Sequence, residues 1–162
     1  MSWRSTLRVP QEHRGLGVPA QIESRKLDGK HEMNTTSSEK ILIIDDSLEI
    51  TRLLHGILSG AGYQVVVSND PRLGRALVSR ERPDLVVLDI CMPGIDGYEL
   101  CQRIRQEHHG PIMLLTVLGG VEHVERTFRV GADAFMTKPF SVTGFLDRVH
   151  SLLHRQVRRL SV

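Results

Sequence analysis

The sequence contains few cysteines, no long apolar segment and little net charge, and each of these absences excludes a class of protein. Its two cysteines, Cys91 and Cys101, are too few for a disulfide framework or a zinc site, so we expect a reducing compartment. No apolar run approaches the ~20 residues of a membrane span, and residues 1–30 lack a hydrophobic signal core. A formal net charge of +2 does not indicate nucleic acid binding. We therefore expect a cytoplasmic protein without a membrane segment.

Length and composition favour one globular domain. The chain has 162 residues, of which 40% are hydrophobic and 25% charged, as is typical of folded proteins. Residues 1–39 have isolated apolar residues and no sustained period, so we expect a disordered N-terminal extension. Met33 begins the segment "MNTTSSEKILIIDD" and is an alternative start of the protein.

From Lys40 onward, short apolar runs alternate with segments of helical periodicity. The runs predict strands at residues 40–45, 63–68, 84–89, 111–116 and 133–138. The helical segments have apolar residues three or four positions apart: Ile50, Leu53, Leu54, Ile57 and Leu58; Leu73 and Leu77; Leu100 and Ile104; Val121, Val124 and Phe128; and Val142, Phe145, Leu146, Val149, Leu152 and Leu153. Strict alternation of strands and helices predicts an open parallel sheet with helices on both faces.

Polar residues end four of the predicted strands. Asp45 and Asp46 end the first, Asp89 the third, Thr116 the fourth and Lys138 the fifth. Because the carboxyl ends of parallel strands share one edge, where open sheets bind ligands, we expect these side chains to lie together. Two carboxylates about 4 Å apart repel by roughly 4 kcal/mol at an effective dielectric constant of ~20. Lys138 and a hard divalent cation such as Mg²⁺ are the expected counter-charges, although one aspartate of the first pair could instead only cap the following helix.

Four motifs in this order resemble the receiver domain of bacterial two-component response regulators. They are "ILIIDDS", "PDLVVLDICMPGIDGYEL", "PIMLLT" and "GADAFMTKPF", and the resemblance covers about residues 40–155. It implies a flavodoxin-like, doubly wound α/β fold with a five-stranded parallel sheet in the order 2-1-3-4-5 and five helices on two faces. Residues 156–162 then form a basic C-terminal tail.

The resemblance also implies a chemistry for the strand ends. Asp89 would accept a phosphoryl group from the phosphohistidine of a histidine kinase or phosphotransfer protein, and the chain would catalyse its own phosphorylation and dephosphorylation there. Asp46, Asp89 and the backbone carbonyl of Cys91 would bind Mg²⁺ directly, and Asp45 would act through metal-bound water. Lys138 would pair with a phosphoryl oxygen and precede a cis peptide bond to Pro139.

A switch follows from two further matches to the family. Thr116 resembles the hydroxyl that turns to the phosphoryl group, and Phe135 resembles the aromatic that then turns inward, although Phe135 could instead be a core residue. The fourth helix, fifth strand and fifth helix, about residues 120–155, would present the changed surface to a downstream protein, and a homodimer is a further expectation. Val117 departs from the family pattern, and its β-branch is expected to crowd the phosphoryl site. Cys91 occupies a position that varies in the family.

Three alternatives stay open at this point. The chain is either a stand-alone receiver that acts by protein contact or a receiver fragment of a DNA-binding transcriptional regulator, with the basic tail as linker; nucleic acid binding by this chain alone is not expected. The receiver fold could also serve as an interaction module without phosphorylation. A phosphatase that uses Asp89 is disfavoured because Cys91 replaces the second aspartate of the usual pair. His55, His108, His109 and His123 show no ligand spacing and are expected at the surface.

Overall fold

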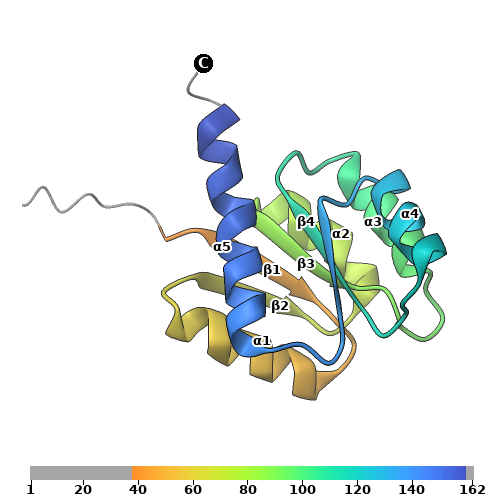
Figure 1. The fold of residues 1–162 in the computed structure, drawn as a ribbon. Coiled ribbons are helices and arrows are strands. Elements are labelled where there is room, and N and C mark those ends of the chain that lie inside the picture. The colour runs from red at the N-terminus through yellow and green to blue at the C-terminus, as the bar shows by residue number, and fades with distance from the viewer. Residues whose placement is uncertain (1–37, 160–162) are drawn as a thin grey trace, which may run out of the picture. The chain divides into compact units, whose positions relative to one another are not determined.

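The computed structural model describes residues 38–159, with side chains described for 38–154, and its centre is a five-stranded parallel sheet (Figure 1). The predicted extension, apart from Ser38 and Glu39, and the alternative start at Met33 lie outside the described residues. The strands are β1 (Lys40–Ile44), β2 (Gln64–Ser68), β3 (Leu85–Asp89), β4 (Ile112–Thr116) and β5 (Ala134–Thr137). Their order is β2-β1-β3-β4-β5, which confirms the predicted topology.

Five helices connect and follow the strands in the described part of the chain. They are α1 (Leu48–Gly60), α2 (Pro71–Glu81), α3 (Gly97–Arg105), α4 (Val121–Arg129) and α5 (Val142–Arg159). Ser47, Asp70 and Asp96 cap the first three helices with side-chain oxygens that accept backbone N–H groups. Gly120 precedes α4 and provides no such bond. None of the described helices is long and apolar enough to span a bilayer.

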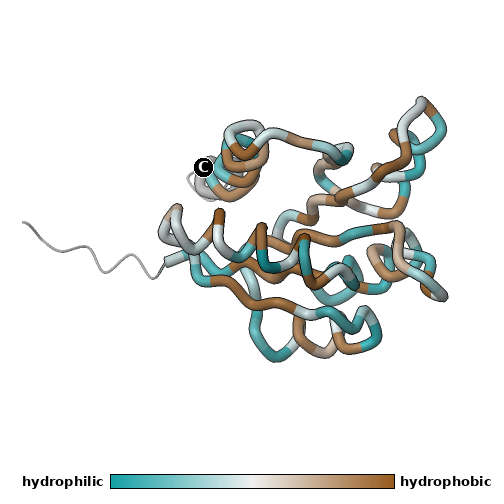
Figure 2. Tube along the Cα trace, turned by 90° about the horizontal axis from the view of Figure 1, so that it is seen from below, coloured by the Kyte–Doolittle hydropathy of each residue, from teal (hydrophilic) through white to brown (hydrophobic). Residues whose placement is uncertain are grey.

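The sheet separates two apolar layers because successive residues of a strand point to opposite faces. Leu42 and Ile44 of β1 pack toward α2 and α3, whereas Ile41 and Ile43 pack toward α1 and α5. Figure 2 shows the hydrophobic colouring running along the strands between the helices. The three central strands are buried almost throughout, so the residues at their carboxyl ends are held on a rigid base.

Several apolar residues of the predicted helical stripes are not buried. Val121 and Phe128 of α4 are 75% and 52% exposed, and Leu53 and Val142 are also exposed. In α4 only Thr127 is buried. Helical periodicity thus identifies an apolar face of a helix without showing what covers that face.

One glycine sets the approach of α3 to the sheet. A Cβ atom on Gly97 would lie 2.3 Å from the Cα atom of Ile90, the residue after β3. This distance excludes any side chain at Gly97 without a backbone shift. Gly97 therefore allows the first turn of α3 to lie directly against the loop that carries the end of β3.

A network of hydrogen bonds connects the loops that precede β4 and β5, at the amino edge of the sheet. Arg105 donates hydrogen bonds to the carbonyl oxygens of Gly131, His108 and Gly110, and to Asp133 Oδ2 at 2.5 Å. Beside it, His108 is only 6% exposed, and its Nε2 atom lies 3.2 Å from the carbonyl oxygen of Pro111. The expectation of a surface position was wrong for His108, because the turn before β4 folds its ring inward.

Burial makes His108 a pH-sensitive element of stability. Burial lowers the pKa of His108 from its usual 6.5, the contact with the Pro111 carbonyl raises it, and the nearby Arg105 lowers it again, so the net pKa is below the ordinary value. The unfolded chain then binds a proton more readily than the folded one. Stability supplied by the neutral ring is complete above the unfolded pKa and is lost as the pH falls below it.

We expect this effect in urea denaturation between about pH 7.5 and about pH 5.5, a range above the ordinary carboxylate pKa values. The wild-type midpoint should fall over this range more steeply than that of His108→Gln, which keeps an N–H donor for the Pro111 carbonyl. His109→Gln, at the exposed neighbouring position, should retain the wild-type slope. Equal slopes for His108→Gln and the wild type would contradict the prediction.

Candidate functional site

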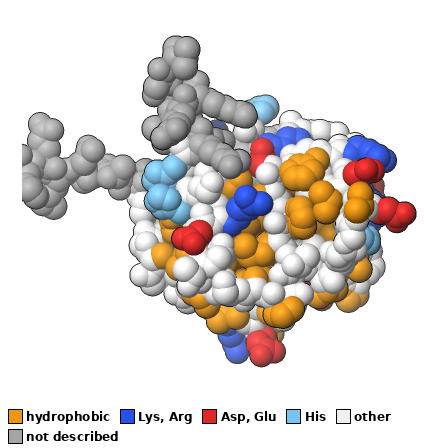
Figure 3. Space-filling model, in the orientation of Figure 1, with side chains coloured by type: hydrophobic (Ala, Val, Ile, Leu, Met, Phe, Trp, Pro, Cys, Tyr) orange, Lys and Arg blue, Asp and Glu red, His pale blue; other side chains and the backbone are white. Residues whose placement is uncertain are grey.

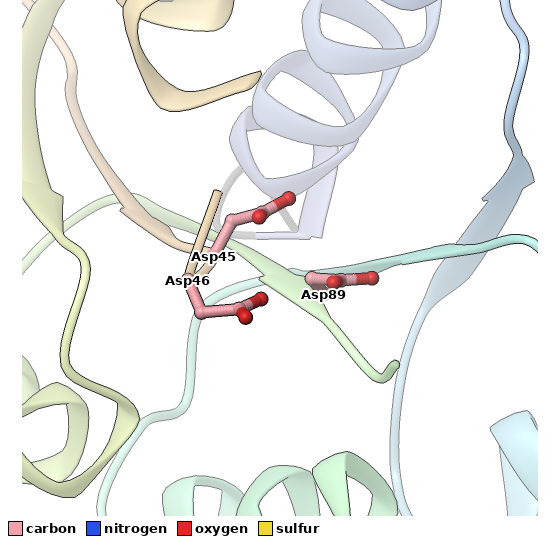
Figure 4. Close-up of side chains that lie close together, drawn as sticks. All are labelled: Asp45, Asp46 and Asp89. Carbon is pink, nitrogen blue, oxygen red and sulfur yellow. The ribbon is translucent and has the colours of Figure 1, made fainter. Parts of the chain in front are cut away.

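Three carboxylates converge at the carboxyl edge of the sheet. Asp45 and Asp46 directly follow β1, and Asp89 is the last residue of β3. One oxygen from each carboxylate lies within 4.8 Å of those of the other two. Figure 4 shows the side chains of Asp45 and Asp46 extending toward the side on which Asp89 lies. Adjacent pairing of β1 with β3 in parallel register produces this convergence.

Lys138 brings a positive charge into the same group from the end of β5. Its Nζ atom lies 2.9 Å from Asp45 Oδ2 and 3.3 Å from Asp89 Oδ1. The Lys138–Pro139 peptide bond is cis, as the family resemblance implied. The two buried carboxylates and the ammonium thus form one compact charge network rather than three separate surface groups.

Burial and charge act in opposite directions on the ionisation of this network. Burial raises the pKa of Asp89, Lys138 lowers it and Asp45 raises it, and the net pKa lies above the ordinary value. Burial lowers the pKa of Lys138, but the carboxylates of Asp45 and Asp89 raise it by more, so the net pKa lies above the ordinary value. The ammonium is therefore held in its charged form. The site accordingly combines a permanent positive charge with a carboxylate that is costly to ionise.

The individual carboxylate oxygens differ in what they contact. Asp45 Oδ1 accepts the backbone N–H of Ser47 at 2.9 Å, and Asp45 Oδ2 accepts a hydrogen bond from Lys138. Asp89 Oδ1 accepts the N–H of Cys91 at 3.3 Å and faces Lys138. Within the described residues, nothing donates to Asp89 Oδ2 or to the exposed carboxylate of Asp46.

The donor set fits a hard divalent cation. Three carboxylates carry three negative charges and Lys138 carries one positive charge, which leaves two negative charges for a cation to balance. All the side-chain donors are oxygens, which Mg²⁺ prefers to nitrogen or sulfur. The Cys91 backbone lies against Asp89 through its N–H group, and coordination by its carbonyl oxygen stays a prediction.

Thr116 ends β4 at the same edge of the sheet, and its hydroxyl group is hydrogen-bonded to the loop that follows. The residue is buried, and its Oγ1 atom accepts the backbone N–H of Leu118 at 2.8 Å. Cys91 Sγ lies 3.8 Å from the same oxygen. Val117 is 63% exposed, so its branched side chain does not pack into the site as its β-branch had suggested.

Phe135, the predicted switch aromatic, is half-buried on β5. Its ring packs against the apolar layer under α2 and α3 and meets Phe128 of α4 edge-on, with ring centroids 6.4 Å apart. Phe135 therefore links the sheet to α4 through Phe128. The sequence places Phe128 in a helical stripe and Phe135 in the switch, and it predicts no contact between them.

The sequence did not predict a polar cluster between α3 and α4. It consists of Asp96, Tyr98, His123 and Arg126. Arg126 donates to Asp96 Oδ2 at 2.6 Å and lies 4.1 Å above the centre of the Tyr98 ring. The hydroxyl group of Tyr98 and Nδ1 of His123 share a hydrogen bond of 3.2 Å. The only available signal was the motif "GIDGYEL", which places Asp96 and Tyr98 at a helix start but names no partner.

Comparisons with known proteins identify the family of this fold. Residues 41–150 match the family described as the response regulator receiver domain. A probable transcriptional regulator ycf27 from Galdieria sulphuraria is 44% identical over 122 residues, which cover 75% of this chain and 48% of the relative. The DNA-binding dual master transcriptional regulator RpaA of Synechocystis sp. is 41% identical over 122 residues, with 74% and 51% covered.

Solved structures give the same class. A CheY-like receiver domain protein of Methanospirillum hungatei has a TM-score of 0.72 and 27% identity, covering 76% of this chain and 99% of that one. The BeF3-activated receiver domain of Klebsiella pneumoniae RstA has a TM-score of 0.67 and 33% identity, covering 70% and 97%. The fold and the acidic cluster at the sheet edge are those of a receiver domain.

The chain belongs to the response regulator receiver domain family of two-component systems. It spans about half the length of the curated relatives it matches.

Proposed function

We propose that this chain is a phosphoacceptor receiver in which Asp89 takes a phosphoryl group from the phosphohistidine of a histidine kinase or phosphotransfer protein. The observation that carries this proposal is the asymmetry of Asp89. One of its oxygens is held by Lys138 and the Cys91 N–H, and no described residue donates to the other. Membership of the receiver family supports the same assignment.

The free oxygen, Asp89 Oδ2, is the nucleophile of the proposed reaction. It bonds to phosphorus while the bond from phosphorus to the donor's imidazole nitrogen breaks, and that nitrogen keeps the electron pair. The product is an acyl phosphate on Asp89, which water later hydrolyses to restore the carboxylate and release phosphate. Lys138 lies 3.3 Å from the other Asp89 oxygen, where its ammonium can neutralise the incoming phosphoryl oxygens.

We assign the Mg²⁺ ligands to Asp46, Asp89 and the backbone carbonyl of Cys91, with Asp45 acting through water. The contacts of Asp45 support this division, since Ser47 and Lys138 already engage both of its oxygens, whereas Asp46 has no partner among the described residues. When bound, Mg²⁺ supplies positive charge that reduces repulsion between the carboxylates and an anionic phosphoryl group.

The proposed output begins at Thr116. Its hydroxyl leaves the N–H of Leu118 and donates to the phosphoryl group, which draws the loop before α4 toward the site. Phe135 then turns inward from its position against Phe128. The surface of residues 120–155 changes as a result and recruits a downstream protein or a second copy of the chain in the cytoplasm. Only partners that distinguish the two states can respond to the switch.

Incubation of the protein with acetyl phosphate and Mg²⁺, followed by intact mass measurement, tests the proposal. We expect the mass to increase by one phosphoryl group, and we expect EDTA to suppress the increase because the carboxylate cluster then lacks its counter-charge. Absence of the increase with acetyl phosphate, phosphoramidate and a phosphorylated histidine donor would instead support an interaction module that works without phosphorylation.

A second candidate concerns the output and not the chemistry. The relatives are named as transcriptional regulators, one of them as DNA-binding, and this chain spans about half of their length. We propose that the receiver regulates transcription as part of a longer protein in which other sequence contacts DNA. The intact mass of the natural protein, purified from its source, distinguishes this candidate from a stand-alone receiver and also identifies the start of translation.

A further inference from the structure

Helix α4 is weakly held by apolar contacts. Thr127 is the one buried residue between Val121 and Arg129, and the large apolar side chains of Val121 and Phe128 are mostly exposed. Gly120 gives the helix no side-chain cap. Figure 3 shows hydrophobic side chains at the surface on the side where α4 lies, next to charged groups. Polar contacts therefore supply much of the attachment of α4 to the domain.

Arg126 makes two of these contacts, and both end on α3. Its guanidinium donates to Asp96 Oδ2 and lies flat enough over Tyr98 to place its central carbon 4.1 Å from the ring centre. Both anchors are fixed independently of Arg126. Tyr98 is buried in the core, and Asp96 Oδ1 caps α3 through the backbone N–H groups of Tyr98 and Glu99.

A short loop connects α4 to Thr116 at the proposed phosphorylation site. The loop consists of Val117, Leu118, Gly119 and Gly120, and it joins Thr116, the last residue of β4, to the start of α4. The Leu118 N–H holds the Thr116 hydroxyl at 2.8 Å. Added Cβ atoms at Gly119 and Gly120 would meet nothing within 4 Å, so the loop has space to move. Its movement is limited mainly by its two ends.

We propose that Arg126 is a positioning residue that clamps α4 against α3 and thereby retains the loop in the arrangement where Leu118 binds Thr116. The clamp opposes phosphorylation, because Thr116 reaches the phosphoryl group only after leaving Leu118. This inference rests on the proposed function of Asp89 and Thr116. It adds a restraint that sets how much of the unphosphorylated protein occupies the phosphorylation-competent arrangement.

The size of the effect follows from the exposure of the contacts. Side chains of Arg126 and Asp96 are about half exposed, at 49% and 46%, so their ion pair is partly screened by solvent. Exposed ion pairs and cation–π contacts are each weak, and together they shift a two-state equilibrium about three- to tenfold. Such a shift is enough to change a phosphorylation rate without unfolding the domain.

Arg126→Met removes both contacts and keeps a long side chain with good helix propensity. We expect the initial rate of phosphoryl incorporation from acetyl phosphate, at saturating Mg²⁺, to rise about three- to tenfold. Hydrogen exchange of Val117–Val121, measured without any phosphodonor, should also accelerate. The matched control is Arg129→Met, at an exposed position of the same helix, whose side chain makes no hydrogen bond or ion pair with the described residues. It should leave both measurements at the wild-type value.

Two further variants separate a positioning role from damage to the fold. Arg126→Lys keeps an ammonium for Asp96 but loses the planar contact with Tyr98, so its rate should lie between those of the wild type and Arg126→Met. Asp96→Asn keeps the cap oxygen and loses the ion pair, and adding Arg126→Met to it should raise the rate less than Arg126→Met does alone.

The outcomes distinguish this inference from the proposed function. A wild-type protein that accepts no phosphoryl group contradicts the function of Asp89, but the exchange of Val117–Val121 still tests the clamp. Unchanged exchange in Arg126→Met overturns the clamp in either case. An unchanged or lower phosphorylation rate in Arg126→Met, or an equal increase in Arg129→Met, also overturns it.

Discussion

Replacing Asp89 with asparagine is expected to abolish phosphoryl incorporation. The amide has no carboxylate oxygen to form an acyl phosphate, and no other described carboxylate has the same combination of burial and contacts with Lys138 and Cys91. The fold should persist, because asparagine has nearly the same volume. Burial and Asp45 raise the pKa of Asp89, so removing its charge relieves a cost, and without metal the variant should unfold at a temperature no lower than the wild type.

Intact mass after incubation with acetyl phosphate and Mg²⁺ measures the first effect, and thermal unfolding measures the second. Asp147→Asn is the matched control, since Asp147 is exposed on α5 and forms no ion pair with the part of the chain that the structure describes. It should be phosphorylated like the wild type. A stoichiometric phosphoryl group on the Asp89→Asn protein would show that another residue is the acceptor.

Gly97→Ala is expected to destabilise the protein by about 3 kcal/mol, at the upper end of the usual cost of overpacking. The new methyl group would lie 2.3 Å from Ile90 Cα and 2.9 Å from its carbonyl carbon. Backbone atoms cannot rotate away as a flexible side chain can, so either α3 or the loop after β3 has to move. The urea midpoint, compared with that of the wild type at constant slope, measures the change.

Gly56→Ala is the opposite test on a glycine in a helix. Gly56 lies inside α1, and an added Cβ atom would meet nothing within 4 Å. Alanine there should increase the free energy of unfolding by about 0.5–1 kcal/mol, because it restricts the unfolded chain and favours the helix. If the two substitutions changed stability by similar amounts, the close approach of α3 to Ile90 would not be what Gly97 provides.

The parallel order of the strands explains why the acidic site could be predicted from sequence. Asp45, Asp46, Asp89 and Lys138 each end or directly follow an apolar run, and parallel strands bring such positions to one edge. The approach of the three aspartates, with one oxygen of each within 4.8 Å of the others, follows from that register, as do the ion pairs of Lys138. Which oxygen of Asp89 stays free, and that both oxygens of Asp45 are engaged, depends on backbone turns that a residue pattern does not specify.

Contacts between different helices could not be predicted from the sequence, because no rule comparable to the parallel order of the strands fixes them. The stripe of Val121, Val124 and Phe128 identifies an apolar face of α4, but the structure leaves much of that face exposed. Arg126 attaches the helix through Asp96, which lies 30 positions earlier in the chain. His108 was also misjudged, because a single histidine in a turn carries no periodic signal of burial.

The thin packing of α4 has a consequence for how such domains diverge. Substitutions at exposed positions such as Val121 and Phe128 remove few buried contacts, so they alter the outer surface at little cost to folding. The three carboxylates, by contrast, end or directly follow strands that are buried on both faces. Descendants of one ancestral receiver can therefore change the outer face of this helix while inheriting the same acidic cluster at the sheet edge.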